Sequence, residues 1–112
     1  MTWSAAALTD RLGGDADLAR ELVDIFLAEY PNLVQAIRAS IDRGDGRALQ
    51  RAAHALRGSV TNFIDDGPTA TALAIEQAAE TSRLNAADGL MGQLEREIDA
   101  LAAAMRGAAR TG

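Results

Sequence analysis

Apolar residues recur at three- and four-residue steps along most of this chain, which is the spacing of one face of an α-helix. The clearest stripe lies near the C-terminus and consists of Leu90, Leu94, Ile98, Leu101 and Met105. A second stripe, in the segment 45–63, consists of Leu49, Ala53, Leu56, Val60 and Phe63. The sequence shows no sustained two-residue alternation, the pattern of a half-buried strand. These patterns predict an all-α protein.

Capping residues and helix-breaking residues predict where the first two helices begin and end. Ser4–Leu12 is expected to form a short helix that stops at Gly13-Gly14. Asp15 suits the N-cap of the next helix. Pro31 interrupts that helix and either kinks it or begins a second one. The apolar positions expected to face the core are Leu18, Leu22, Ile25 and Phe26 before the proline and Leu33, Val34, Ile37 and Ile41 after it.

The middle of the chain contains two further helices. The segment 44–46 is a turn in which Asp45 is available to cap the following helix, and that helix is predicted to end near 62–65. Pro68 suits the first position of the next helix, which runs to about Arg83.

The last helix has signals at both ends. Asn85 is expected to cap it, with Asp88 as a partial capping-box partner. Gly107 is expected to end it, and the tail beyond is expected to be frayed. Four amphipathic helices joined by short loops imply an antiparallel four-helix bundle. The fold predicted from the sequence is therefore such a bundle with a short additional N-terminal helix.

Composition limits the function classes. The 112 residues are expected to form a single domain, whose core spans about residues 10 to 105. The net charge of −5 argues against nucleic-acid binding. The absence of cysteine excludes disulfides and thiolate chemistry, and no group of residues has metal-ligand spacing. The N-terminus lacks the features of a signal peptide, and no apolar run approaches the ~20 residues that span a bilayer. We therefore expect a cytoplasmic protein that does not bind membranes.

The single histidine, His54, lies outside the apolar stripe of its helix. Arg47 and Arg51 share its polar side, and Gly58 follows it by one turn. A glycine inside a helix costs about 1 kcal/mol relative to alanine, so its presence needs a reason. One reason is space, because a residue without a β-carbon leaves the imidazole edge open. A solvated histidine without a role explains neither Gly58 nor the adjacent Arg57, so the pattern indicates a reactive histidine.

This pattern resembles the histidine-containing phosphotransfer (HPt) family. The family signature is His-x-Leu-Lys/Arg-Gly followed by small residues, and here the segment 54–59 reads His-Ala-Leu-Arg-Gly-Ser. Ile75-Glu76 falls where the following helix of the family carries an apolar residue and then Glu or Gln. The N-terminal lead-in of the family is matched by Gly13-Gly14-Asp15, Leu18, Leu22 and Phe26. The resemblance covers about residues 10 to 105.

The resemblance implies a function. His54 would accept a phosphoryl group from a receiver-domain aspartate and pass it to another, in a two-component phosphorelay. The partners would be the receiver domains of response regulators and of hybrid histidine kinases, and the receiver would supply Mg²⁺. The chain would hold no cofactor or ATP site of its own and would be a carrier, not an enzyme. The alternative from another class is a helical adaptor that binds a signalling partner without carrying phosphate.

Glu76 is the candidate for orienting the imidazole. It falls between apolar positions of its helix, and a carboxylate in such surroundings needs a partner. In the family, the residue at this offset can bond the inner ring nitrogen and leave the outer one as the nucleophile. Gln77 and Glu80 remain alternatives for this role.

The arginines of the His54 helix have two expected roles. Arg57, about one turn beyond His54, can reach a phosphoryl group and offset its charge. The family usually has a lysine at this position. Arg47 and Arg51 make the His54 face basic in an acidic chain, which suits docking of an acidic partner, although a solvated charge run is equally plausible.

Overall fold

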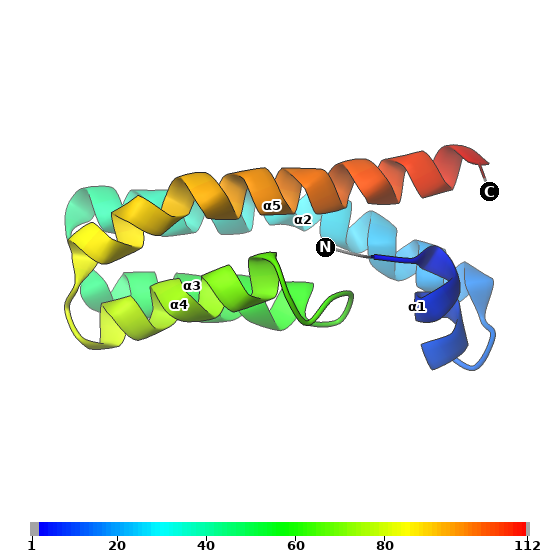
Figure 1. The fold of residues 1–112 in the computed structure, drawn as a ribbon, viewed down its shortest axis with the longest axis horizontal. Helices are drawn as coiled ribbons and strands as arrows, with labels where there is room; N and C mark the ends of the chain where they lie inside the picture. Colours follow the sequence, from blue (N-terminus) through cyan, green and yellow to red (C-terminus); the bar gives the residue numbers. More distant parts are fainter. Residues whose placement is uncertain (1–2, 112) are drawn as a thin grey trace.

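The described part of the chain folds into five helices. The structure is a computed structural model that describes residues 3–111, with side chains for residues 3–108. The helices are α1 (Ala5–Arg11), α2 (Ala16–Arg43), α3 (Gly46–Val60), α4 (Pro68–Glu80) and α5 (Leu84–Thr111). The described residues contain no strand. Helices α2 to α5 form an antiparallel bundle and α1 packs at one end of it, which confirms the predicted fold (Figure 1).

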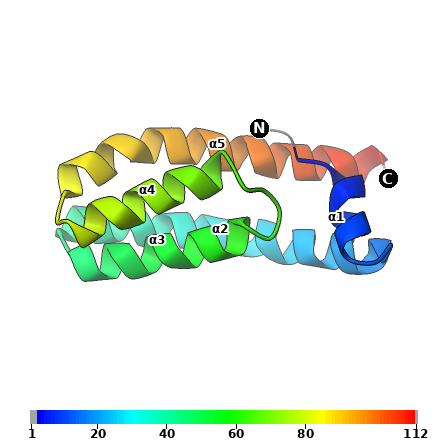
Figure 2. The same ribbon diagram turned by 60° about the horizontal axis from the view of Figure 1, so that its bottom comes forward.

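The four bundle helices differ in length. Helices α2 and α5 have 28 residues each, whereas α3 has 15 and α4 has 13. At 1.5 Å per residue a 28-residue helix is about 42 Å long, so the long pair determines the 43 Å longest extent of the molecule. The long pair extends past α3 and α4, and α1 lies at this overhang (Figure 2).

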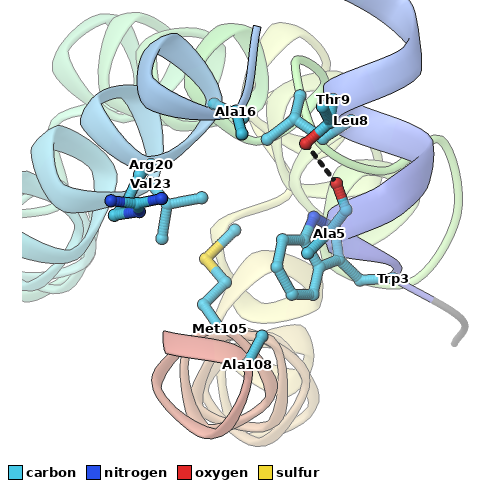
Figure 3. Close-up of a pocket in the computed structure, with 10 residues that line it drawn as sticks. Trp3, Ala5, Leu8, Thr9, Ala16, Arg20, Val23, Met105 and Ala108 are labelled. Atoms are coloured by element: carbon cyan, nitrogen blue, oxygen red, sulfur yellow. Dashed lines mark hydrogen bonds between the residues drawn. The ribbon is translucent and has the colours of Figure 1, made fainter. Parts of the chain in front are cut away.

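Helix α1 packs onto the bundle through its apolar side. Leu8 is buried, and Trp3 and Leu12 are partly buried against the core. A pocket of about 160 Å³ lies where α1 meets α2 and α5. Figure 3 shows Met105 between Trp3 and Val23 in the lining of this pocket. Nη2 of Arg11 donates a hydrogen bond to the carbonyl of Asn62, 2.8 Å away, which ties α1 to the segment after α3. The N-terminal helix is therefore part of the folded domain.

The core is built mainly from aliphatic side chains. The stripe predicted for α3 is buried throughout, and in α5 every member is buried except Leu90, which is partly buried. The buried members of these stripes are Leu49, Ala53, Leu56, Val60, Phe63, Leu94, Ile98, Leu101 and Met105. No helix within residues 3–111 combines the length and the apolar character needed to span a membrane.

Side-chain caps start α2 and α3 as predicted. Oδ1 of Asp15 accepts a hydrogen bond from the Leu18 N–H at 2.9 Å. Oδ1 of Asp45 accepts one from the Ala48 N–H at 3.0 Å. Gly44 ends α2 in the left-handed region at φ 67°, so α3 begins after only two residues and folds back along α2.

Pro31 lies inside α2, which continues through it as one helix. Two other ends differ from the prediction by a few residues. Helix α3 ends at Val60, and turns continue to residue 63. Helix α4 ends at Glu80 instead of Arg83, because Ser82 takes a left-handed conformation at φ 57°. The N–H groups of Ser82 and Arg83 then donate hydrogen bonds back to the carbonyls of Ala79 and Ala78 in the last turn.

The residues predicted to start and to end the last helix, Asn85 and Gly107, do neither. The Ala87 N–H donates to the Arg83 carbonyl at 3.2 Å, so Arg83 takes the cap position and Asn85 lies inside α5. Asp88 accepts a hydrogen bond from Arg38 at 3.5 Å instead of completing a capping box. Gly107 does not end the helix, which continues to Thr111, because the cost of about 1 kcal/mol for a glycine does not by itself stop a helix.

The core face assigned to the start of α2 is also partly wrong. Leu18 is 38% exposed and Ile25 is 49% exposed. The buried side of this segment consists of Ala19, Val23, Phe26 and Tyr30. These first turns of α2 lie in the overhang, where α3 and α4 do not cover them, so one flank of the apolar stripe remains open to solvent (Figure 2).

The cap of α3 gives a stability prediction. Asp45→Ala should lower the free energy of unfolding by about 1 kcal/mol, because the Ala48 N–H loses its side-chain acceptor. Urea unfolding followed by circular dichroism measures this change. Asp45→Asn is the matched control and should retain most of the stability, because asparagine caps helices about as well as aspartate. Equal stability of the alanine and asparagine variants would contradict the role of this cap.

Candidate functional site

Helix α3 presents His54 to solvent. The helix buries Leu49, Ala53, Leu56 and Val60, and His54 lies on its opposite, outer side. The His54 side chain is 66% exposed. Helix α4 packs alongside α3, so residues of α4 lie within reach of the imidazole (Figure 1). The site is therefore an exposed ring at the seam between two helices.

Glu76 of α4 contacts the inner nitrogen of the ring. Its Oε1 lies 2.8 Å from Nδ1 of His54, so the contact expected from the sequence is present. Glu76 is 7% exposed although it carries a carboxylate. The two alternatives do not occupy this position, because Glu80 accepts a hydrogen bond from Gln50 at 3.1 Å and Gln77 is exposed.

Arg57 joins the same cluster. Its Nε donates to Oε2 of Glu76 at 2.8 Å, and its Nη2 lies 3.5 Å from Oε1. The same Nη2 lies 3.0 Å from Nδ1 of His54. The guanidinium therefore lies at the inner edge of the imidazole, on the carboxylate. This pairing was not predicted from the sequence, because it depends on the packing of α3 against α4 and not on spacing within α3.

The cluster keeps Glu76 ionised. Burial alone raises the pKa of Glu76, but the hydrogen bonds from Arg57 and His54 and the charge of Arg57 outweigh burial and hold that pKa below the ordinary 4.5. The hydrogen bond to Glu76 raises the pKa of Arg57. At neutral pH the pair therefore consists of a carboxylate and a guanidinium.

The ionised carboxylate fixes the tautomer of His54. A neutral imidazole has one N–H donor and one lone pair, and Oε1 of Glu76 can only accept. At 2.8 Å, a lone pair on Nδ1 would face a lone pair on Oε1 and repel it, so the proton belongs on Nδ1. The nucleophilic lone pair is then on Nε2, the outer nitrogen of the exposed ring.

The surface around His54 is open and basic. A β-carbon added at Gly58 would meet no other atom within 4 Å, so the space one turn beyond His54 is free. Arg47 and Arg51 are exposed, about two turns and one turn before His54 on the same side of α3. Leu73 lies one turn before Glu76 on α4 and is 38% exposed, so α4 carries an exposed apolar side chain in the turn before Glu76. In the part of the chain described here, no group of three or more His, Cys, Asp or Glu side chains is placed to hold a metal ion.

Comparison with known families agrees with this fold and places the chain in a class. The family model described as Hpt domain matches residues 21–104, which is most of the chain. The chain therefore belongs to the Hpt domain family, whose members are histidine phosphotransfer domains.

A solved structure shares the fold over nearly its whole length. It is the crystal structure of histidine-containing phosphotransfer protein B (HptB) from Pseudomonas aeruginosa PAO1. The two structures superpose with a TM-score of 0.88 at 21% identity, covering 98% of this chain and 96% of that chain. At this identity the likeness shows the fold alone. No curated protein matches the chain.

Ionised Glu76 predicts an acid-dependent contribution to stability. A carboxylate with a lowered pKa stabilises the folded state fully above 4.5, and this stabilisation is lost as the pH falls through the lowered value. The difference in unfolding free energy between the wild type and Glu76→Gln should therefore shrink as the pH falls from about 5 to about 3. Urea unfolding at each pH measures it. A constant difference over this range would show that Glu76 does not have the lowered pKa.

Proposed function

We propose that this chain accepts a phosphoryl group on Nε2 of His54 from a receiver-domain aspartate and passes it to an aspartate of another receiver. The observation that carries the proposal is the 2.8 Å contact between Nδ1 of His54 and the buried carboxylate of Glu76. This contact holds the proton on the inner nitrogen, and the exposed outer nitrogen keeps its lone pair. Membership of the Hpt domain family supports the same assignment.

The transfer step requires only one nucleophile from this chain. The lone pair on Nε2 attacks the phosphorus of an aspartyl phosphate, a P–N bond forms, and the P–O bond to the aspartate breaks. The aspartate leaves as a carboxylate, and the imidazole takes on positive charge. The Nδ1–H of His54 continues to donate to Glu76, whose negative charge stabilises the charged ring. Transfer to the next receiver reverses these changes, and Mg²⁺ held by the receiver would offset the charge of the phosphoryl group.

The surroundings of His54 suit docking of an acidic partner. A receiver active site carries clustered carboxylates, and Arg47 and Arg51 place positive charge on the His54 face of an otherwise acidic chain. Gly58 leaves room for the incoming phosphoryl group and the loops around it. The exposed side chain of Leu73, one turn before Glu76 on α4, is available for apolar contact with a partner. In this proposal the chain contributes a nucleophile and a docking surface, and it has no catalytic cofactor of its own.

His54→Gln tests the proposal. Incubation with a phosphorylated receiver should label the wild type on His54 only, and the label should be labile in acid and stable in base, as a phosphoramidate bond is. The variant should fold normally and take no label, because the ring that bears Nε2 is gone. Radiolabel transfer and mass spectrometry measure this. If the variant keeps its signalling activity in the cell, the chain is instead an adaptor that carries no phosphate.

Gly58 gives a second test, in which stability and transfer change in opposite directions. Gly58→Leu should keep or raise the thermal stability, because it removes the backbone penalty of a helical glycine, and it should slow transfer strongly, because the side chain enters the space beside His54. Gly58→Ala is the matched control. It should raise stability by about 1 kcal/mol and leave the transfer rate near that of the wild type. Unchanged transfer in Gly58→Leu would show that the open space has no role.

A further inference from the structure

Arg57 contacts the Glu76 carboxylate through two of its nitrogens. Nε lies 2.8 Å from Oε2, and Nη2 lies 3.5 Å from Oε1, so one side of the guanidinium faces both oxygens. Such a fork restrains both the position and the rotation of a carboxylate. Once Oε2 is held by Nε, Oε1 is directed at Nδ1 of His54, 2.8 Å away. The orientation of the acceptor for the imidazole proton therefore depends on Arg57.

The contacts of Arg57 act on the imidazole in two opposing directions. Through Glu76 they favour the tautomer with the proton on Nδ1. The direct approach of Nη2 to Nδ1, at 3.0 Å, would instead favour a lone pair on Nδ1 and a proton on Nε2. The carboxylate is closer to Nδ1 and carries a full negative charge, so its influence dominates.

The position of Arg57 is also unsuited to holding the transferred group. Its guanidinium lies at the Nδ1 edge of the ring, whereas a phosphoryl group on Nε2 extends from the opposite edge into solvent. The Arg57 side chain is only 30% exposed, and it pairs with a carboxylate that is itself buried. Movement to the phosphoryl group would leave the Glu76 charge buried without its cation, which is strongly unfavourable.

We infer that Arg57 is a positioning residue, which acts through Glu76 to keep the proton of His54 on Nδ1 and the lone pair on Nε2, and that it does not bind the phosphoryl group. This inference replaces the direct contact with phosphate expected from the sequence. Its kinetic consequence rests on the proposed function, but its structural consequence, the tautomer of His54, does not.

The tautomer is measured in the isolated protein, without phosphate or a partner. Nitrogen-15 NMR at a pH where the ring is neutral should show the proton of wild-type His54 mainly on Nδ1. Arg57→Ala should increase the fraction with the proton on Nε2, because Glu76 is no longer held against the ring. Arg57→Lys should give an intermediate fraction, since a single ammonium keeps the charge beside Glu76 but cannot engage both oxygens in one plane.

Two control variants test whether the tautomer shift depends on the contact between Arg57 and Glu76. Arg43→Ala removes the same charge from an exposed position in the last turn of α2 and should leave the tautomer fractions unchanged. Arg57→Lys covers the case in which Arg57→Ala does not fold, because the lysine still neutralises Glu76. A shift towards Nδ1–H in Arg57→Ala or Arg57→Lys, or no shift in either, would overturn the inference.

A double-mutant cycle gives the kinetic test. The rate of phosphoryl transfer onto His54 is measured for the wild type, Arg57→Ala, Glu76→Gln and the double variant. Each single variant should lose on the order of tenfold in rate, as is typical when a partner that orients a reactive group is removed. The double variant should lose no more than Glu76→Gln alone, because Arg57 acts through Glu76.

The outcomes separate the inference from the function. Rate losses that multiply in the double variant would mean that Arg57 acts on the phosphoryl group directly, and the inference would be wrong while the proposed function stood. A wild-type protein that takes no phosphate but shows the tautomer shift would reject the proposed function and retain the role of Arg57 in positioning the ring.

Discussion

The buried carboxylate of Glu76 is the constraint on which the site depends. An ionised group that is 7% exposed needs charged or hydrogen-bonding partners, and the structure supplies them from α3. Arg57 provides the positive charge, and His54 provides a second N–H donor. The cluster therefore joins α3 to α4 and orients the imidazole at the same time. A solvated glutamate would not impose this arrangement, because water would satisfy it in any orientation.

The helix packing brings Glu76 within reach of His54. Both helices contain small buried residues: Ala53 on α3 and Ala72 on α4 are fully buried, and Ala79 on α4 is nearly so. A β-carbon at Gly46 would lie 3.7 Å from the carbonyl of Ala79, so the start of α3 approaches the backbone of α4 closely. Larger side chains at these positions would separate the helices, and the 2.8 Å contacts across the seam would be lost. The alanine content of the core thus has a direct chemical consequence.

The sequence predicts the helices whose apolar stripes face neighbours on both sides, because burial decides those positions. The predictions are wrong where the neighbouring helices end, as at Leu18 and Ile25 in the overhang, and at the start of α5, where Asn85 is not the cap. The motif identified His54, and its offset to the next helix identified Glu76. The pairing of Arg57 was missed, because an arginine on the exposed side of a helix is equally compatible with solvent, phosphate or a neighbouring carboxylate until the packing is known.

A carrier faces a requirement that an enzyme with a single product does not. It must take the phosphoryl group from one aspartate and give it to another. Tight binding of the phosphoryl group would therefore lower the rate of its transfer to the second aspartate. In the proposed relay the positive charge nearest to His54 is paired with Glu76 inside the protein, and the phosphoryl group on Nε2 faces solvent and the next partner. In this proposal the Nδ1–H that Glu76 holds serves both directions, because the ring then attacks as a neutral imidazole and also leaves as one. Under the proposed function, this arrangement would make the imidazole reactive without making the chain a tight binder of phosphate.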